Sequence, residues 1–182
     1  MQGLSGKKSI GGFKSVTFTN GGMVFDKISL RLGQKILLSR YGDMVVRYVP
    51  RLLLRLFTIA QLKTIWSPKA SPKRVHYETM EMLDLLEYRG GDEIINKLSS
   101  YLLERRNPQN EKRWFGTLGR LKVPVRLCWG DEDAVAPIEI PYELIKRAKL
   151  EKTEVKVMKG LGHFAMLEKP KEWLKVCLGI DF

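Results

Sequence analysis

The sequence predicts an α/β fold with about three parallel strands and flanking helices, interrupted by one large helical insertion. Short runs rich in β-branched or alternating apolar residues occupy 15–20, 123–130 and 153–158, and turn residues follow each run. Helical periodicity covers 137–150 and the stretch that begins at Lys169-Pro170. Because the end of the chain alternates strand, helix, strand and helix, the strands are expected to be parallel.

Composition restricts the classes of protein to consider. A chain of 182 residues with 44% hydrophobic residues corresponds to one domain with an ordinary core. The net charge of +12 favours acidic partners, anionic membrane surfaces or nucleic acid without identifying one of them. The basic residues at 105–106 and 112–113 have no interleaved aromatic residues, which argues against nucleic acid as a partner. Cys128 and Cys177 lie in apolar stretches without metal-ligand spacing, so we expect reduced core thiols and no metal or other cofactor.

The chain begins with a segment that carries no clear periodicity. Residues 1–14 are rich in Gly, Ser and Lys and are expected to form a flexible tail. Ser5 lies in GLSGK, which lacks the second glycine of G-x-S-x-G and follows no strand, so it is not expected to be a nucleophile. The first strand, SVTFTN, stops at Asn20 before two glycines. Residues 15–22 and 122–182 are therefore assigned to the core.

The insertion, 23–121, is predicted to be a contiguous helical cap. Its first helix is expected to start at Asp26 as a capping residue and to reach about Ser39. The Tyr41-Gly42-Asp43 stretch separates it from a second helix that reaches about Leu62 and is bent or restarted at Pro50. Further helices are predicted over 71–89, 92–106 and 111–120.

Three arginines recur every four residues in this cap. Arg47, Arg51 and Arg55 are predicted to form one basic stripe on a helix. Such a stripe is typical of a helix on an anionic membrane or against a phosphate-bearing partner, but more often it is the solvated face of a packed helix. The second interpretation is favoured here.

The stretch VPVRLCWGDEDAVAP, 123–137, places acidic residues at a sheet edge. Val125, Leu127 and Trp129 alternate with Arg126 and Cys128 as in a strand, and GDED ends the alternation. The next strand, TEVKVM, is followed by KGLGHF, which carries His163. Since parallel strands end at the same edge, Asp133 and His163 are expected to meet there. A carboxylate that accepts the Nδ1 proton of an imidazole leaves Nε2 free to act as a general base.

These motifs together resemble the end of an α/β-hydrolase. G-D-E-D-x-V-x-P after a strand, G-x-G-H-F after the next strand, and E-K-P before the last helix agree with that family in order and spacing. The N-G-G after the first strand and Arg113-Trp114 are similar to the branch of the mesoderm-specific transcript proteins, which is related to epoxide hydrolases and haloalkane dehalogenases. The resemblance implies a partial α/β-hydrolase core carrying a helical cap.

The resemblance also assigns roles to residues. It implies that Asp133 is the acid of the catalytic triad and His163 its base, with Asp131 as the fallback acid. Some members of the wider group carry the acid after the strand that corresponds to 15–20, but this chain has Asn20 there, which favours Asp133. The implied substrates of a complete protein are small molecules such as esters, epoxides or haloalkanes.

The sequence departs from the family in its first half. No G-x-S-x-G, and no strand, turn and helix carrying an Asp or Cys nucleophile, precedes Ser15, and no oxyanion loop is apparent. The expectation is therefore the C-terminal portion of a hydrolase, inactive as this chain, whose exposed sheet edge favours self-association or a partner chain. The alternative is a non-catalytic protein whose basic cap contacts a membrane or a partner protein. Without a signal sequence, a cytoplasmic or internal-membrane location is expected rather than secretion.

Overall fold

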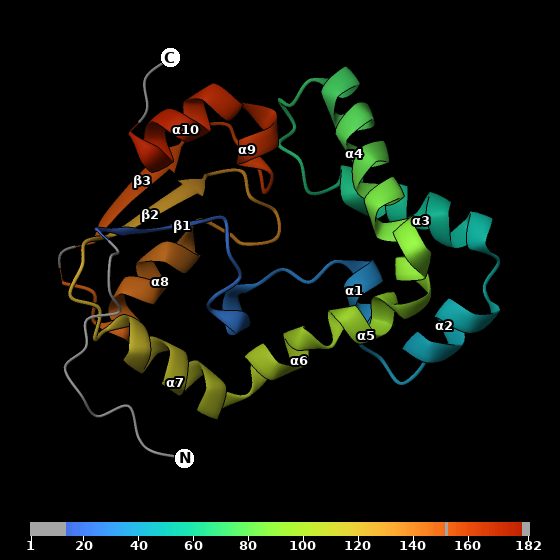
Figure 1. Ribbon diagram of the computed structural model, residues 1–182, viewed down its shortest axis with the longest axis horizontal. Helices are drawn as coiled ribbons and strands as arrows, with labels where there is room; N and C mark the ends of the chain where they lie inside the picture. The colour runs from blue at the N-terminus through green and yellow to red at the C-terminus, as the bar shows by residue number, and fades with distance from the viewer. Residues whose placement is uncertain (1–13, 152, 180–182) are drawn as a thin grey trace.

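The computed structural model describes residues 14–151 and 153–179, and its three strands form one parallel sheet (Figure 1). The strands are β1 (Val16–Thr19), β2 (Val125–Gly130) and β3 (Glu154–Met158), in the order β1-β2-β3. The predicted number of strands and their parallel direction are thus confirmed. Of the predicted N-terminal tail, 1–14, all but Lys14 lies outside the described residues.

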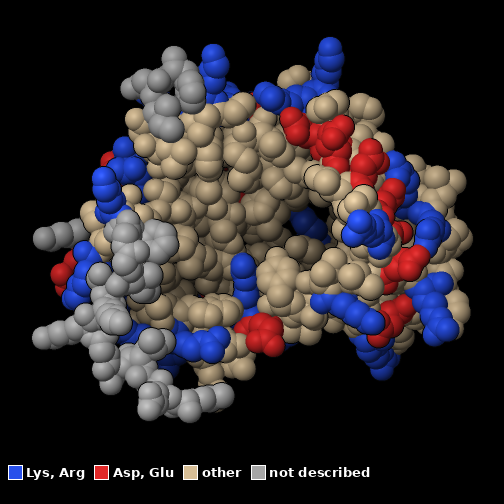
Figure 2. Space-filling view, viewed as in Figure 1, with Lys and Arg blue, Asp and Glu red and all other residues tan. Residues whose placement is uncertain are grey.

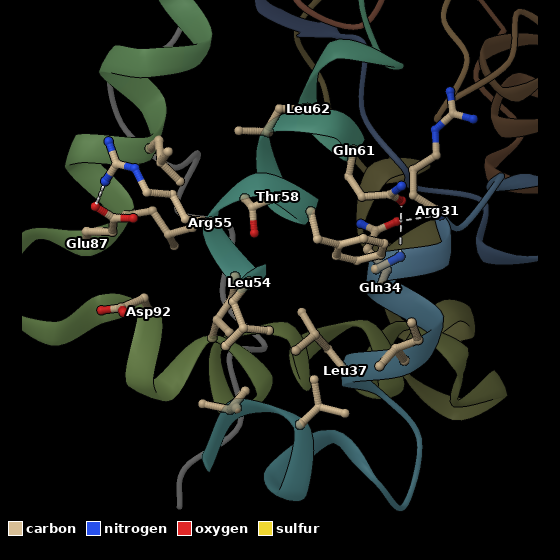
Figure 3. A pocket seen from close by; sticks show the side chains of 18 of the residues that line it. Arg31, Gln34, Leu37, Leu54, Arg55, Thr58, Gln61, Leu62, Glu87 and Asp92 are labelled. Atoms are coloured by element: carbon tan, nitrogen blue, oxygen red, sulfur yellow. Dashed lines mark hydrogen bonds and ion pairs between the residues drawn. The ribbon is translucent and has the colours of Figure 1, made fainter. Parts of the chain in front are cut away.

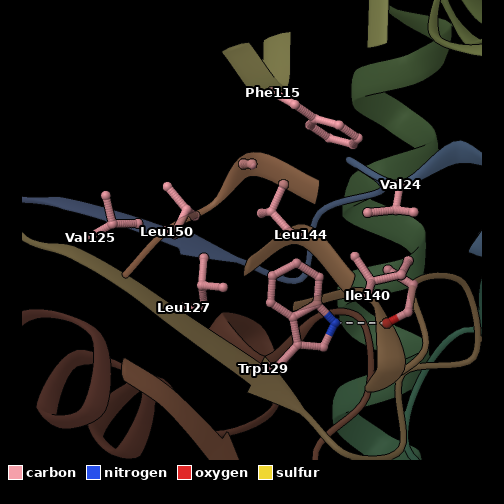
Figure 4. Packing of buried hydrophobic residues seen from close by; sticks show 10 residues of the cluster. Val24, Phe115, Val125, Leu127, Trp129, Ile140, Leu144 and Leu150 are labelled. Carbon is pink, nitrogen blue, oxygen red and sulfur yellow. Dashed lines mark hydrogen bonds between the residues drawn. The ribbon is translucent and has the colours of Figure 1, made fainter. Parts of the chain in front are cut away.

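The central strand β2 is buried on both faces, because helices cover the sheet on each side. One face carries Val125, Leu127 and Trp129, with Leu127 and Trp129 fully inaccessible to solvent. The helices α7 (Pro108–Leu118) and α8 (Glu139–Ala148) pack on this face (Figure 4). Trp129 also donates a hydrogen bond from Nε1 to the Ala136 carbonyl at 2.8 Å, which satisfies its one buried polar group. The side chains that pack in this cluster from outside β2 are Val24, Phe115, Ala136, Ile140, Leu144, Ala148 and Leu150.

The opposite face of the sheet is smaller and carries the thiols. Helices α9 (Ala165–Glu168) and α10 (Pro170–Leu178) cover Cys128 and Met158 on this side. Cys128 and Cys177 are both free and buried, as predicted. The neighbouring Cys177 thiol and burial raise the pKa of Cys128, so that it stays a neutral core residue. The core is therefore a three-layer arrangement of helices, sheet and helices.

The helical cap forms a second lobe beside this core (Figure 1). It joins the core through β1 at one end and α7 at the other, and α3 and α4 pack side by side within it. Phe115 of α7 belongs to the core cluster, so this last helix of the predicted cap region packs on the sheet side. The short and long helices of the cap are η1 (Phe25–Lys27), α1 (Leu32–Leu37), α2 (Gly42–Tyr48), α3 (Arg51–Lys63), α4 (Pro72–Glu87), η2 (Tyr88–Ile94), α5 (Ile95–Ser99) and α6 (Tyr101–Arg106).

Two of the helices predicted for the cap are wrong in extent. The chain after Asp26 makes only the short η1 and is then extended to Arg31, because the Ser29 amide donates to the Val135 carbonyl of the core instead of to a helical turn. The predicted helix over 92–106 is broken into η2, α5 and α6. Its start is delayed by Arg89 and Gly90, whose positive φ angles of 53° and 76° turn the chain out of the right-handed helix. The predicted restart at Pro50 is confirmed.

Many large apolar side chains of the cap face solvent. Among the large apolar side chains that are exposed in residues 14–151 and 153–179, all but Tyr142 and Leu178 lie within 32–103. Despite this apolar surface, none of the helices described is long and apolar enough to cross a membrane.

Candidate active site

Asp133 and His163 meet at the edge where β2 and β3 end. His163 Nδ1 lies 2.8 Å from Oδ2 and 3.0 Å from Oδ1 of Asp133. The two residues follow paired parallel strands, which brings them together across 30 positions of sequence. The Asp133 side chain is fully buried, whereas that of His163 is 24% exposed. A buried carboxylate is thus directed at one ring nitrogen, and the imidazole reaches toward solvent.

The Asp133 carboxylate is held by three further hydrogen bonds. Oδ1 accepts from the backbone amides of Val135 and Ala136, each at 2.8 Å, which makes the turn after β2 a cradle for the charge. Oδ2 accepts from Asn20 Nδ2 at 2.9 Å. With His163 included, both carboxylate oxygens have partners, as a buried charge requires.

Asn20 ties β1 to this pair, a role that no sequence motif assigns to it. The residue is 6% exposed and has a φ of 43°, the left-handed region that Asn tolerates. Its Nδ2 also donates to the Gly162 carbonyl at 2.9 Å, directly before His163. The signal that could have found it is its position at the end of a strand of the same sheet.

The three consecutive acids after β2 have three separate partners. Asp131 Oδ1 accepts from the Gly160 amide at 2.6 Å, and the residue makes no hydrogen bond to His163. Glu132 accepts from Lys69 Nζ at 2.8 Å and from Ser67 Oγ at 2.6 Å, and these bonds, that of Lys69 first, lower the pKa of its carboxyl. Only Asp133 reaches the imidazole. The structure therefore does not bring the fallback acid, Asp131, to the base.

The loop that carries His163 is fastened to the cap. The His163 amide donates to the Ile65 carbonyl at 3.2 Å, and the Ser67 hydroxyl lies 2.8 Å from the Gly160 carbonyl. The Glu168 carboxylate accepts from the amides of Ser67 and Gly162, both at 3.1 Å. A Cβ atom at Gly162 would lie 2.4 Å from the Ser67 nitrogen, so this close approach requires glycine. The cap segment 65–67 therefore sets the position of the histidine backbone.

His163 lines one end of a cavity of about 600 Å³ between the core and the cap. Its Nε2 has no hydrogen-bond partner within residues 14–151 and 153–179, which leaves this nitrogen available to a ligand. Figure 3 shows the part of the cavity in the cap, where Leu37, Leu54 and Leu62 surround the space and Thr58 points into it. The walls are mainly aliphatic and come from Ile36, Leu37, Val45, Val46, Val49, Leu53, Leu54, Leu62, Ile65, Leu83, Leu86 and Ile95.

The three arginines of the predicted basic stripe do not share one helix. Arg47 lies on α2, whereas Arg51 and Arg55 lie on α3 after the break at Pro50, so the expectation of one continuous face is wrong. Arg51 pairs with Glu93, and Arg55 pairs with Glu87. On the face shown in Figure 2, basic and acidic side chains alternate over the cap rather than forming a uniform basic patch.

Comparison with curated proteins identifies two kinds of relative, while no protein-family model matches the chain. LipZ of Mycobacterium tuberculosis, described as a candidate hydrolase, is 31% identical over 167 residues, covering 92% of this chain and 54% of LipZ. The mesoderm-specific transcript protein of Mus musculus is 25% identical over 179 residues, covering 98% of this chain and 50% of that protein. The chain thus spans about half the length of the curated relatives it matches.

Solved structures agree with this relationship at the level of the fold. An α/β-hydrolase fold protein from Burkholderia ambifaria superposes with a TM-score of 0.62 at 12% identity, over 92% of this chain and 57% of that one. A thermophilic esterase from Thermogutta terrifontis gives a TM-score of 0.55 at 17% identity, over 90% and 57% respectively. With the parallel sheet, the cap and the order of the motifs, these similarities show that the chain has the α/β-hydrolase fold in part, namely part of the core together with the helical cap.

Proposed function

We propose that Asp133 and His163 are the acid and the base of a hydrolase that cleaves small ester-like molecules. The observation that carries this proposal is the contact of 2.8 Å between His163 Nδ1 and a fully buried carboxylate, with Nε2 unpartnered at an apolar cavity. The esterase among the structural neighbours and the hydrolase description of LipZ support an ester as the substrate class, with epoxides and haloalkanes as alternatives within the lineage.

The geometry determines which nitrogen of His163 would act. Asp133 accepts the Nδ1 proton, which fixes the neutral tautomer with a lone pair on Nε2. Nε2 would then take a proton from the attacking hydroxyl or water and return it to the leaving alcohol. The positive charge on the imidazolium in between is stabilised by Asp133.

The nucleophile is proposed to come from a part of the core outside these 182 residues, because they contain no G-x-S-x-G. Within the described residues β1 pairs only with β2, so its other edge can accept another strand. The rest of the core, which would carry the nucleophile, is proposed to lie beside this edge. It follows that the chain by itself would be inactive and could instead associate with a second chain at this edge.

Completion of the core tests this proposal. We would join the chain to the part of LipZ that the match does not cover, and follow hydrolysis of p-nitrophenyl butyrate by the fusion and by the chain without it. Turnover is expected from the fusion and not from the unfused chain. Asp133→Asn in the fusion should lower turnover by about 10⁴-fold, because His163 would no longer be held in the tautomer that leaves Nε2 free. His163→Ala should lower it at least as much.

The matched control for that experiment is Asp131→Asn, which changes a carboxylate two residues away that makes no hydrogen bond to His163. It should leave turnover within a few-fold of the parent. If Asp131→Asn abolished turnover and Asp133→Asn did not, the assigned acid would be wrong. A folded fusion without any turnover would count against the hydrolase itself.

A second candidate function is suggested by the surface of α2 and α3. More than half of each of the side chains of Tyr48, Leu52 and Leu56 is accessible to solvent. Arg47 and Arg51 of the same two helices are also exposed. Apolar residues next to basic ones are typical of helices that lie on anionic membranes. Under this proposal the chain would pellet with vesicles that contain phosphatidylserine but not with pure phosphatidylcholine, and Leu52→Ser with Leu56→Ser would abolish the binding. Equal pelleting of the variant and the parent would reject it.

A further inference from the structure

We propose that the cavity binds a single-chain amphiphile whose anionic head lies at Arg31 near His163 and whose tail runs between the cap helices. The proposal deepens the function above, and rests on it in that the cavity is taken as the substrate site. It names the ligand class more narrowly, as a molecule with an acidic group and a linear apolar chain, which includes the carboxylate product of ester cleavage. It assigns Arg31 the role of binding that acidic group.

Three hydrogen bonds place Arg31 at the catalytic end of the cavity. The Ser29 amide donates to the Val135 carbonyl at 2.9 Å, which fixes the extended segment before Arg31 against the turn that holds Asp133. Arg31 Nη2 donates to the Thr64 carbonyl at 2.9 Å. The carbonyl of the next residue, Ile65, accepts from the His163 amide. Arg31 and His163 are thus bound to consecutive carbonyls at the end of α3.

Arg31 differs from the other arginines of the cavity in having no anionic partner among residues 14–151 and 153–179. Arg51 and Arg55, also in the lining, form ion pairs with Glu93 and Glu87. Arg31 has no ion pair within the described part of the chain, and its Nε is buried without any hydrogen-bond partner. Among the described residues the Arg31 guanidinium therefore lacks an ion-pair partner, which an anionic group in the cavity would supply.

Figure 2 shows a hollow where the core meets the cap, with basic side-chain atoms visible in its depth and mainly uncharged atoms around it.

The remainder of the cavity suits an apolar chain, because most of its lining is aliphatic and the oxygens of its two glutamines accept hydrogen bonds from the backbone. Gln34 Oε1 accepts from the Arg31 amide, and Gln61 Oε1 accepts from the Gly33 amide, at 2.9 and 3.1 Å. Figure 3 shows both glutamines turned toward the backbone of α1, while the space between α1 and α3 is lined by leucines. A carboxylate matches the planar guanidinium best among common acidic groups. A carboxylate is also what ester cleavage would leave at this end.

Calorimetry of the 182-residue chain with decanoate and decanamide tests the proposal. The two probes have the same chain and a planar head of similar size, and only decanoate is charged. The parent is expected to bind decanoate at least about tenfold more tightly than decanamide. Arg31→Gln should weaken decanoate binding about tenfold or more and leave decanamide unchanged. Arg40→Gln, a change at an exposed cap arginine outside the lining, should alter neither.

Two more variants and a third probe test where the tail lies and which acidic group the head carries. Thr58→Trp, which fills the cap part of the cavity, should abolish binding of both probes, whereas Arg31→Lys should retain part of the preference for the anion. Decyl phosphate distinguishes a carboxylate site from a general anion site, since tighter binding of the phosphate would assign the head as a phosphate. The comparison of decanoate with decanamide on the parent chain does not depend on the folding of any variant.

Two results would overturn the inference: equal affinity of the parent for decanoate and decanamide, or no binding of decanoate by the folded chain. Neither depends on a nucleophile, so the outcome is independent of the turnover experiment. If the fusion showed no turnover while the chain bound decanoate, only the proposed hydrolase activity would be rejected. Turnover without decanoate binding would reject only the role of Arg31.

Discussion

The core and the cap of this chain are stabilised differently. In the core, side chains such as Leu127, Trp129 and Leu144 are completely inaccessible to solvent and pack in one cluster between the sheet and its helices. In the cap, the fully buried residues are few, and apolar side chains such as Leu52 and Leu85 are 66% and 76% exposed. The core is thus a close-packed interior, whereas the cap surrounds a cavity. The proposed active site lies where the core and the cap meet. The core supplies the acid, and both regions hold the base.

The largest expected effect comes from removing packing in the core. Leu127→Ala should lower the free energy of unfolding by about 2–5 kcal/mol, because it leaves a cavity beneath Trp129 that the sheet cannot close. The cap variant Leu56→Ala removes the same atoms from a side chain that is 54% exposed, and should change it by no more than about 0.5 kcal/mol. Urea denaturation followed by circular dichroism measures both. Equal losses in the two variants would mean that the cap surface is buried in solution.

A smaller effect on stability is expected where the cap contacts the loop that carries His163. Ser67 is 4% exposed and its hydroxyl lies within hydrogen-bond distance of the Gly160 carbonyl, so Ser67→Ala should cost about 1–3 kcal/mol. Amide hydrogen exchange sharpens the comparison. Loss of protection should appear in 65–70 and 160–164, while the amides of β2 remain protected. Increased exchange throughout the core would show instead that the contact of Ser67 with the loop that carries His163 is part of the packed interior.

The smallest effect on stability is expected for an ion pair at a second contact between the cap and the core. Arg147 of α8 binds Asp26 of η1 through two bonds of 2.8 Å, and the hydrogen bond from Arg147 lowers the pKa of the Asp26 carboxyl below its ordinary value of 3.8. Arg147→Met should cost about 1 kcal/mol or less, since Asp26 is half exposed.

The pH dependence distinguishes this pair from packing. A carboxyl whose pKa is lowered by folding stabilises the protein above its unfolded pKa, and this contribution is lost as pH falls through the lowered folded value. Arg147 also binds Glu143 and lowers the pKa of that carboxyl below 4.5, so the difference between parent and Arg147→Met should be complete at pH 7 and decline below about pH 4.5. Urea midpoints of the two proteins at several pH values test this. A difference that persisted unchanged at about pH 2 would indicate lost packing of the arginine chain instead.

The core was the more predictable of the two regions, because its patterns are local and its geometry is regular. Alternation in VRLCW predicted the buried face of β2, and the common direction of parallel strands predicted the meeting of Asp133 with His163. The cap was less predictable. Its first helix is displaced by a bond from Ser29 to Val135, a residue far away in the sequence, and no local pattern contains such a contact.

The supporting residues of the site were the least predictable. Arg31, Ser67 and Glu168 belong to no motif that assigns them a role, since each acts through a partner from a distant segment. Their contribution follows from the packing of the cap against the core. Such residues become visible only when both segments are placed.

Asn20 gives the site a route by which its acid could change strands during evolution. Its side chain is within hydrogen-bond distance of Asp133 Oδ2, which in turn binds the imidazole, so an amide and a carboxylate stand side by side at the ends of neighbouring strands. Exchanging the two, Asn20→Asp with Asp133→Asn, would keep the total charge and the number of polar groups around His163 unchanged. The acid could thus pass from one strand to the other through two single-base codon changes, since Asn and Asp codons differ at one position, and the histidine would retain a carboxylate within a short distance in the exchanged protein.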